Sequence, residues 1–179
     1  PMFYMRELPT RDLLDAVGQV FPELDPTAVE ACYFLLRTGT DVLTAFDETL
    51  SRYNISQSRF IVLLLLKRLE LREVPDGDIS PSKLAELAGV SRGTMTGLLS
   101  GLERDGLIER KLYSGDRRRF SILMTEKGKK TLDNIFPEYY NRIAGLMSGL
   151  NEKERLTLIK LLNKVKDGVP SLRISNGQT

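Results

Sequence analysis

Apolar residues recur at helical spacing along most of this chain, and capping residues mark where successive helices begin. Ser, Thr, Asp and Asn are the residue types that accept hydrogen bonds from the first N–H groups of a helix. A Pro in the first turn, as after Asp25 and Ser80, strengthens the signal. The expected caps, with the helices that they open, are Thr10 (to about 20), Asp25 (to about 51), Ser56 (57–71), Ser80 (81–88), Ser91 (92–104), Thr125 (to about 148) and Asn151 (to 166).

The period changes after residue 106, where two short runs with strand character cover 107–112 and 120–124. They flank a segment with three consecutive arginines, so we expect a β-hairpin with a basic tip. Two short helices precede it, and this order predicts a winged helix-turn-helix. We therefore expect a mainly α fold with a small hairpin, in which the winged lobe is joined to a helical dimerisation lobe. The residues expected to face the core of the two short helices are Leu84, Leu87, Ala88, Met95, Leu98, Leu99 and Leu102.

The opposite face of the helix over 92–104 is polar and suited to DNA. It carries Arg92, Thr94, Thr96 and Ser100, which we expect to meet base edges and phosphates near the helix N-terminus. Glycines recur every four residues on this helix, at 93, 97 and 101, and each costs about 1 kcal/mol against Ala. Two explanations stay open: the helix backbone approaches DNA closely, or it packs tightly against a neighbour.

Composition argues against most catalytic and metal chemistry. The 179 residues include no His and one Cys, which excludes His-based triads, His zinc sites and an intrachain disulfide. We therefore expect no enzyme activity, no cofactor and no metal, and a cytoplasmic protein. The longest apolar run, Phe60 to Leu66, has seven residues, against about 20 for a membrane span, so we expect no membrane partner.

Charge is unevenly spread although the net charge is only +2. Residues 1–51 carry a net charge of −6, and residues 110–130 carry +6. A solvated charged face is the ordinary explanation of a charge run. A basic segment in a nearly neutral chain is also typical of a local polyanion site, and the hairpin tip is a place where such a site is useful.

Several motifs together resemble the MarR family of bacterial and archaeal transcriptional regulators. They are Leu84-Ala85 through Gly89-Val90-Ser91, Leu102-Glu103 with Gly106-Leu107-Ile108 and Arg110, Asp116-Arg117-Arg118, and Leu123-Met124-Thr125-Glu126-Lys127-Gly128. The likeness covers about residues 25 to 166. Ser100-Gly101 departs from the commoner pattern, which has basic or larger polar residues there, and this bears on base specificity.

The resemblance implies a homodimeric repressor that binds double-stranded DNA at a pseudo-palindromic operator. It implies that Arg118 enters the minor groove and that Asp116 orients it. The domains expected are an extension with a short helix (1–24), a dimerisation region (25–53 and 125–168), a winged helix lobe (54–124) and a flexible tail (169–179). The expected DNA-binding residues are Ser82, Arg92, Thr94, Thr96, Ser100, Arg110, Arg117, Arg118 and Arg119.

The resemblance also implies an effector, for which a small aromatic or phenolic molecule is expected near Tyr53, Arg59, Tyr139 and Tyr140. One alternative is a peroxide-sensing repressor switched through Cys32. In that branch of the family two tyrosines support the thiolate, whereas Leu36 and Phe46 stand at those positions here. A buried Cys32 acting as a small apolar residue is the other interpretation. A more distant alternative is a protein-interaction module that does not bind DNA.

Overall fold

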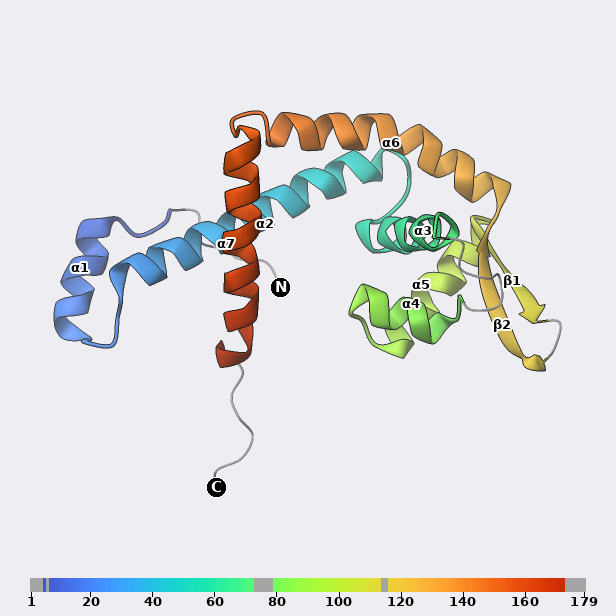
Figure 1. Cartoon of the computed structure of the whole chain (residues 1–179), viewed down its shortest axis with the longest axis horizontal. Coiled ribbons are helices and arrows are strands. Elements are labelled where there is room, and N and C mark those ends of the chain that lie inside the picture. Colours follow the sequence, from blue (N-terminus) through green and yellow to red (C-terminus); the bar gives the residue numbers. More distant parts are fainter. Residues whose placement is uncertain (1–4, 6, 73–78, 114–115, 173–179) are drawn as a thin grey trace, which may run out of the picture. The chain divides into compact units, whose positions relative to one another are not determined.

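The computed structural model describes residue 5 and residues 7–72, 79–113 and 116–172, with the backbone alone for residues 113 and 116–119. Contacts divide the chain into two compact units, Pro1–Asp133 and Asn134–Thr179. The first unit holds helices α1 to α5, the two strands and the start of α6 (Figure 1). The second holds the rest of α6, then α7 and a final 3-10 turn, η1. The domain boundaries expected from the sequence stay a prediction.

The capping residues predict the helix starts correctly. The side chains of Thr10, Asp25, Ser56, Ser80, Ser91 and Asn151 each accept a hydrogen bond from a backbone N–H in the first turn, and Asn151 with Glu154 completes a capping box. The helices are α1 (Arg11–Val20), α2 (Pro26–Ser51), α3 (Gln57–Glu70), α4 (Pro81–Ala88), α5 (Arg92–Arg104), α6 (Glu126–Leu146) and α7 (Glu152–Gly168).

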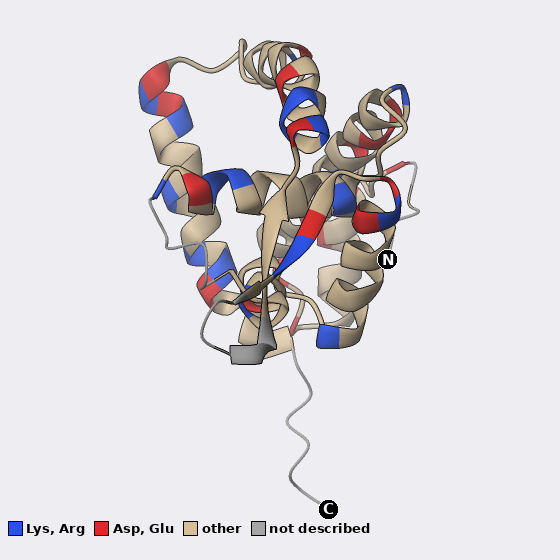
Figure 2. Ribbon diagram, turned by 90° about the vertical axis from the view of Figure 1, so that its right-hand side faces the viewer, with Lys and Arg blue, Asp and Glu red and all other residues tan. Residues whose placement is uncertain are grey.

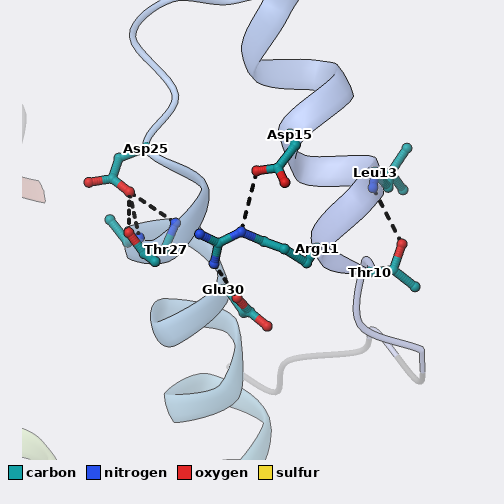
Figure 3. A network of polar contacts seen from close by, with 8 residues as sticks. Thr10, Arg11, Leu13, Asp15, Asp25, Thr27 and Glu30 are labelled. Atoms are coloured by element: carbon teal, nitrogen blue, oxygen red, sulfur yellow. Dashed lines mark hydrogen bonds and ion pairs between the residues drawn. The ribbon is translucent and has the colours of Figure 1, made fainter.

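A polar network joins α1 to the start of α2. The Arg11 guanidinium lies between Asp15 of its own helix (3.3 Å) and Glu30 of α2 (2.8 Å), as Figure 3 shows. Asp25 caps α2 by accepting bonds from the Thr27 hydroxyl and the Thr27 and Ala28 N–H groups. These bonds lower the pKa of the Asp25 carboxyl, and the bond from the Thr27 hydroxyl has the largest effect. The N-terminal extension is therefore held to α2 by charge as well as by the buried Leu14.

The core of the first unit lies where α3, α4 and α5 meet the hairpin (Figure 1). Phe60, Leu63 and Leu66 of α3 are fully buried. They share this core with Leu84 and Ala85 of α4 and with Met95, Leu99 and Leu102 of α5. Burial of such side chains contributes roughly 1.5–3 kcal/mol each, so apolar packing holds the two short helices in place.

Three positions expected in this core are not fully buried. Leu87 is 37% exposed and Ala88 is half-buried, and Ala85 takes the inward place beside Leu84. Leu98 is only half-buried, whereas Gly101 is buried. In both helices the buried stripe is displaced slightly from the one that the leucines alone predict, because a small residue allows the closest approach to a neighbouring helix.

The hairpin is longer than the sequence predicts. Strand β1 (Ile108–Tyr113) pairs antiparallel with β2 (Asp116–Met124), and the pairing continues to Tyr113 opposite Asp116 after an irregularity at Leu112. The three arginines, which the sequence places between the two strands, therefore belong to the first residues of β2 beside the tip. Only residues 114 and 115, which lie outside the described residues, separate the strands. Ile79 adds a further link, since its carbonyl accepts from the Ile122 N–H at 2.9 Å.

The Thr125–Gly128 segment holds the turn between α5 and β1. The Thr125 hydroxyl donates to the Gly106 carbonyl (2.7 Å), and the Lys127 ammonium donates to the Asp105 carbonyl (2.7 Å). The Thr125 oxygen also accepts from the Gly128 N–H (3.1 Å) and so caps α6 as predicted. A Cβ added at Gly128 would overlap the Leu107 carbonyl oxygen and lie 2.7 Å from Met124 Cγ. Gly128 is therefore required by the close approach of α6 to this turn.

In the second unit α7 buries none of its residues. Leu162 and Val165 of α7 and Val169, its C-cap, share one face at helical spacing and are all exposed. Residues 169–172 form η1 (Val169–Leu172), and the rest of the expected tail lies outside the described residues.

We expect Gly128→Ala to lower the free energy of unfolding by about 1–3 kcal/mol, because the new methyl meets backbone that cannot move aside cheaply. Gly97→Ala is the matched control, since its Cβ meets nothing within 4 Å, and it should raise stability by up to about 1 kcal/mol. Urea unfolding followed by circular dichroism measures both changes. Equal effects of the two substitutions would contradict the packing described for Gly128.

Candidate nucleic-acid interface

Helix α5 has one buried face and one polar face. Met95, Leu99 and Leu102 are completely buried, and this fixes the rotation of the helix about its axis. On the opposite face Arg92, Thr94, Thr96 and Ser100 are all exposed, as the sequence predicts. A polar face held by a packed core can keep a defined geometry toward a large polar partner.

The first turn of α5 is organised by hydrogen bonds among its own side chains. Ser91 Oγ accepts from the Thr94 N–H (3.1 Å) and lies 2.8 Å from the Thr94 hydroxyl. The Thr96 hydroxyl donates to the Arg92 carbonyl at 2.9 Å. The Thr96 hydroxyl oxygen thus keeps lone pairs that can accept a bond from a partner.

A shallow hollow of about 500 Å³ lies between the start of α4 and the start of α5. Ser82, Lys83 and Arg92 line it together with Glu86, and Lys83 pairs with Glu86 at 3.2 Å. Ser82 and Arg92, both expected to contact DNA, are therefore brought to one place. The N-terminal turns of two helices, with their N–H groups, flank this hollow.

The three glycines of α5 have different reasons to be there. A Cβ at Gly97 would meet nothing, and one at Gly93 would only reach Ser91 Oγ at 3.8 Å. A Cβ at Gly101 would overlap the guanidinium of Arg59, at 2.8 Å from its Cζ. Tight packing therefore explains Gly101, whereas close approach to DNA stays a prediction for Gly93 and Gly97.

The wing contributes charge from both strands. Arg110 of β1 pairs with Glu103 of α5 at 3.0 Å, which ties the base of the hairpin to α5. The backbone of Asp116 and of Arg117, Arg118 and Arg119 lies in β2, and their side chains lie outside the described residues. Both acidic and basic segments occur along the helices (Figure 2). In the sequence, residues 110–130 carry a net charge of +6.

The residues expected near an effector fall in both units. Tyr53 and Arg59 belong to the first unit, where the Arg59 guanidinium pairs with Asp105 at 2.7 Å. Tyr139 and Tyr140 belong to the second, where their ring centroids lie 5.6 Å apart. Burial raises the pKa of the Tyr139 hydroxyl, and the neighbouring Tyr140 adds to the shift. A role of these four residues in ligand binding stays a prediction.

Cys32 is exposed, so the expectation that this thiol is buried is wrong for the single chain. Cys32 lies near the N-terminal end of α2, whereas the buried residues of this helix, Thr49 and Leu50, lie near its C-terminal end. Exposure gives a thiol access to oxidants, but a reactive thiolate also needs hydrogen-bond donors or nearby positive charge.

The sequence alone does not reveal the residues that support α5 and the hairpin through contacts at the turn between them. The sequence predicts Thr125 only as a helix cap, whereas its hydroxyl also donates to the Gly106 carbonyl in the turn between α5 and β1. Asp105, at the end of α5, accepts from the Arg59 guanidinium. The signal available was the Thr-Glu-Lys-Gly segment, but its partners lie about 20 residues away along the chain.

Comparison with known proteins places these features in a family. A model described as the MarR family matches residues 55–120. The chain is 33% identical over 131 residues to the transcriptional repressor MprA of Escherichia coli (strain K12), covering 69% of this chain and 72% of that protein. The chain belongs to the MarR family. This MarR-family chain is also 26% identical over 158 residues to the transcriptional repressor YetL of Bacillus subtilis (strain 168), covering 88% and 92% of the two chains.

Solved structures of MarR regulators share its fold. The S. aureus MepR–DNA complex has a TM-score of 0.67 at 22% identity, covering 77% of this chain and 95% of that chain. CouR from Rhodococcus jostii RHA1 bound to p-coumaroyl-CoA has a TM-score of 0.59 at 21% identity, covering 83% and 95%. The chain is thus a DNA-binding transcriptional regulator of the MarR type with a winged helix, in a family of regulators rather than of enzymes.

Two further features of the described residues concern metal ions and membranes. No cluster of three or more His, Cys, Asp or Glu side chains there is placed to hold a metal ion. Among the described helices, none combines the length and apolar character that a bilayer crossing requires.

We expect Arg92→Gln to weaken DNA binding and to reduce the slope of log affinity against log salt by about 1 for each phosphate group that the protein no longer neutralises. Arg11→Gln is the matched control, because it removes the same charge from α1. Fluorescence anisotropy of a labelled duplex at several salt concentrations measures both slopes. Identical slopes for the two variants would remove Arg92 from the interface.

Proposed function

We propose that this chain works as a homodimeric repressor that reads an imperfect palindrome through α5 and the β1–β2 hairpin and releases it on binding a small ligand. The observation that carries the proposal is the division of α5 into a fully buried face and an exposed polar face. A helix with these two faces can enter the major groove while its position is set by the core.

The wing is proposed to supply the second contact. Arg117, Arg118 and Arg119 follow one another on β2, and Arg118 is proposed to enter the minor groove with Asp116 orienting it. Arginine suits a narrow groove, where the negative potential is enhanced. Arg110 is paired with Glu103, so its proposed contribution is to phosphates beside the base of the wing.

Dimer formation is proposed from the exposed apolar faces of the helical regions. Leu162 and Val165 of α7 and Val169 at its C-cap are 40–51% exposed along one face. On α2, Phe34 and Leu43 are also more than half exposed. Burying such a surface against a second copy gains about 25 cal/mol per Å², and a symmetric pair would present two DNA-reading sets to the two halves of a palindrome.

An aromatic or phenolic ligand is proposed as the effector. Support comes from a cluster of rings on α6, in which Phe136 and Tyr140 have centroids 5.3 Å apart and Tyr139 lies beside them. Flat rings of this kind bind aromatic ligands by offset or edge-to-face contact. The structure of CouR, which has a similar fold, is bound to p-coumaroyl-CoA.

We expect Arg118→Ala to lower affinity for the operator about tenfold or more, because one good groove contact is worth roughly 1–3 kcal/mol. The midpoint of thermal unfolding should stay unchanged, since this side chain is proposed to serve DNA rather than the core. A gel-shift titration beside a melting curve tests the pair of outcomes. An unaltered affinity would exclude the wing from DNA recognition.

We expect Leu162→Glu to convert the dimer to monomer, because it places a charge in the centre of the exposed apolar face of α7. Asn163→Glu adds the same charge one residue further on and should leave the dimer intact. Sedimentation velocity over a concentration series distinguishes the two species. If both variants sediment like the unsubstituted chain, this face of α7 does not form the dimer.

A further inference from the structure

An ion pair joins the start of α3 to the end of α5. The Arg59 guanidinium, in the first turn of α3, donates through Nη1 to Asp105 Oδ2 at 2.7 Å. Asp105 is the C-cap of α5 and lies 46 residues away along the chain. The Arg59 side chain is 26% exposed and that of Asp105 is 39% exposed, so the pair is partly withdrawn from solvent.

The guanidinium also lies against the backbone of α5. Gly101 is buried, and an added Cβ there would stand 2.8 Å from Arg59 Cζ and 3.0 Å from Nε, and would overlap Nη2. Only a glycine leaves room for the guanidinium at this place. Arg59 thus touches α5 one turn before its end and again at the end itself, which restrains both tilt and rotation of that helix.

Asp105 is held from a second side by α6. Its carbonyl oxygen accepts from the Lys127 ammonium at 2.7 Å, while its carboxylate accepts from Arg59. One residue at the end of α5 therefore receives cations from α3 and from α6. A partly exposed ion pair contributes little to stability, about 0–1 kcal/mol in most proteins, so its geometry is of more consequence than its energy.

We propose that Arg59 is a positioning residue for DNA recognition: it fixes the angle at which α5 presents its polar face. The proposal rests on the proposed role of α5 as the recognition helix. Arg59 faces Gly101 and Asp105 on the core side of α5, and it acts on the DNA contacts of Arg92 and Thr96 only through the helix. A lysine cannot reproduce both contacts, because it lacks the planar fork of the guanidinium.

A positioning role has a distinct signature in DNA binding. Contacts to base edges depend on the angle of the helix, whereas phosphate contacts to unrelated DNA tolerate a change of angle. Loss of Arg59 should therefore reduce the ratio of operator affinity to unspecific affinity about tenfold, as much as one mismatched base pair does. Affinity for unrelated DNA and its salt dependence should stay unchanged.

The experiment compares Arg59→Gln, Gly101→Ala and the double variant in the full chain. Two duplexes are used: the one that the unsubstituted chain selects from random sequences, and a shuffled duplex of equal length. Gly101→Ala keeps every charged group but displaces the guanidinium. Lys67→Gln is the control, because it removes a cation of α3 that pairs within its own helix, with Glu70 at 4.0 Å.

Each single variant should lower the affinity ratio about tenfold, the double variant should lower it no further, and Lys67→Gln should leave it unchanged. Non-additivity is expected because both substitutions remove the same contact. If Arg59→Gln does not fold, the affinity ratio of Gly101→Ala tests the proposal. This variant is expected to fold, since the methyl displaces only the end of a flexible side chain.

Two results would overturn the proposal. A folded Gly101→Ala chain with an unchanged affinity ratio would show that Arg59 does not position α5. An equal loss on both duplexes would make Arg59 a direct phosphate contact. Failure of the unsubstituted chain to select any sequence would instead refute the proposed function. The two failures can be told apart, because the selection is done before any variant is made.

Discussion

The turn from α5 into β1 is the point on which the geometry of the proposed DNA interface depends. Gly106 gives the turn its left-handed residue, with a φ of 71°, and Leu107 follows it into the core. Arg59 holds the turn from α3, and Thr125 and Lys127 hold it from the start of α6. Both the end of α5 and the start of β1 are fixed by these contacts.

Apolar packing and polar contacts have separate tasks in this arrangement. The fully buried Met95, Leu99 and Leu102 hold α5 against its neighbours, and their burial supplies most of the free energy. The ion pair and hydrogen bonds at the turn add little energy but have strict geometry. The buried face of α5 therefore packs in the core, and the contacts at its C-terminal end set its orientation. Its polar face stays exposed.

Local features of the fold could be predicted from the sequence because their causes are local. Caps such as Ser56 and Ser91, and the left-handed Gly89, depend on residues at most four positions away. Helical spacing predicts inward places for Leu87 and Leu98, but Leu87 is exposed and Leu98 only half-buried, because burial depends on which neighbour packs against a helix. The contact between Arg59 and Gly101 could not be foreseen for the same reason. Exposed Arg92, Thr96 and Ser100 followed from helical spacing alone.

We propose that two copies of this chain read a two-fold symmetric duplex, each with one helix and one wing. Selection of bound fragments from random double-stranded DNA by the full chain, followed by sequencing, tests this proposal most directly. We expect an enriched inverted repeat whose half-sites are centred about one helical turn, or a multiple of it, apart. Enrichment of a single half-site without symmetry, or no enrichment at all, would contradict it.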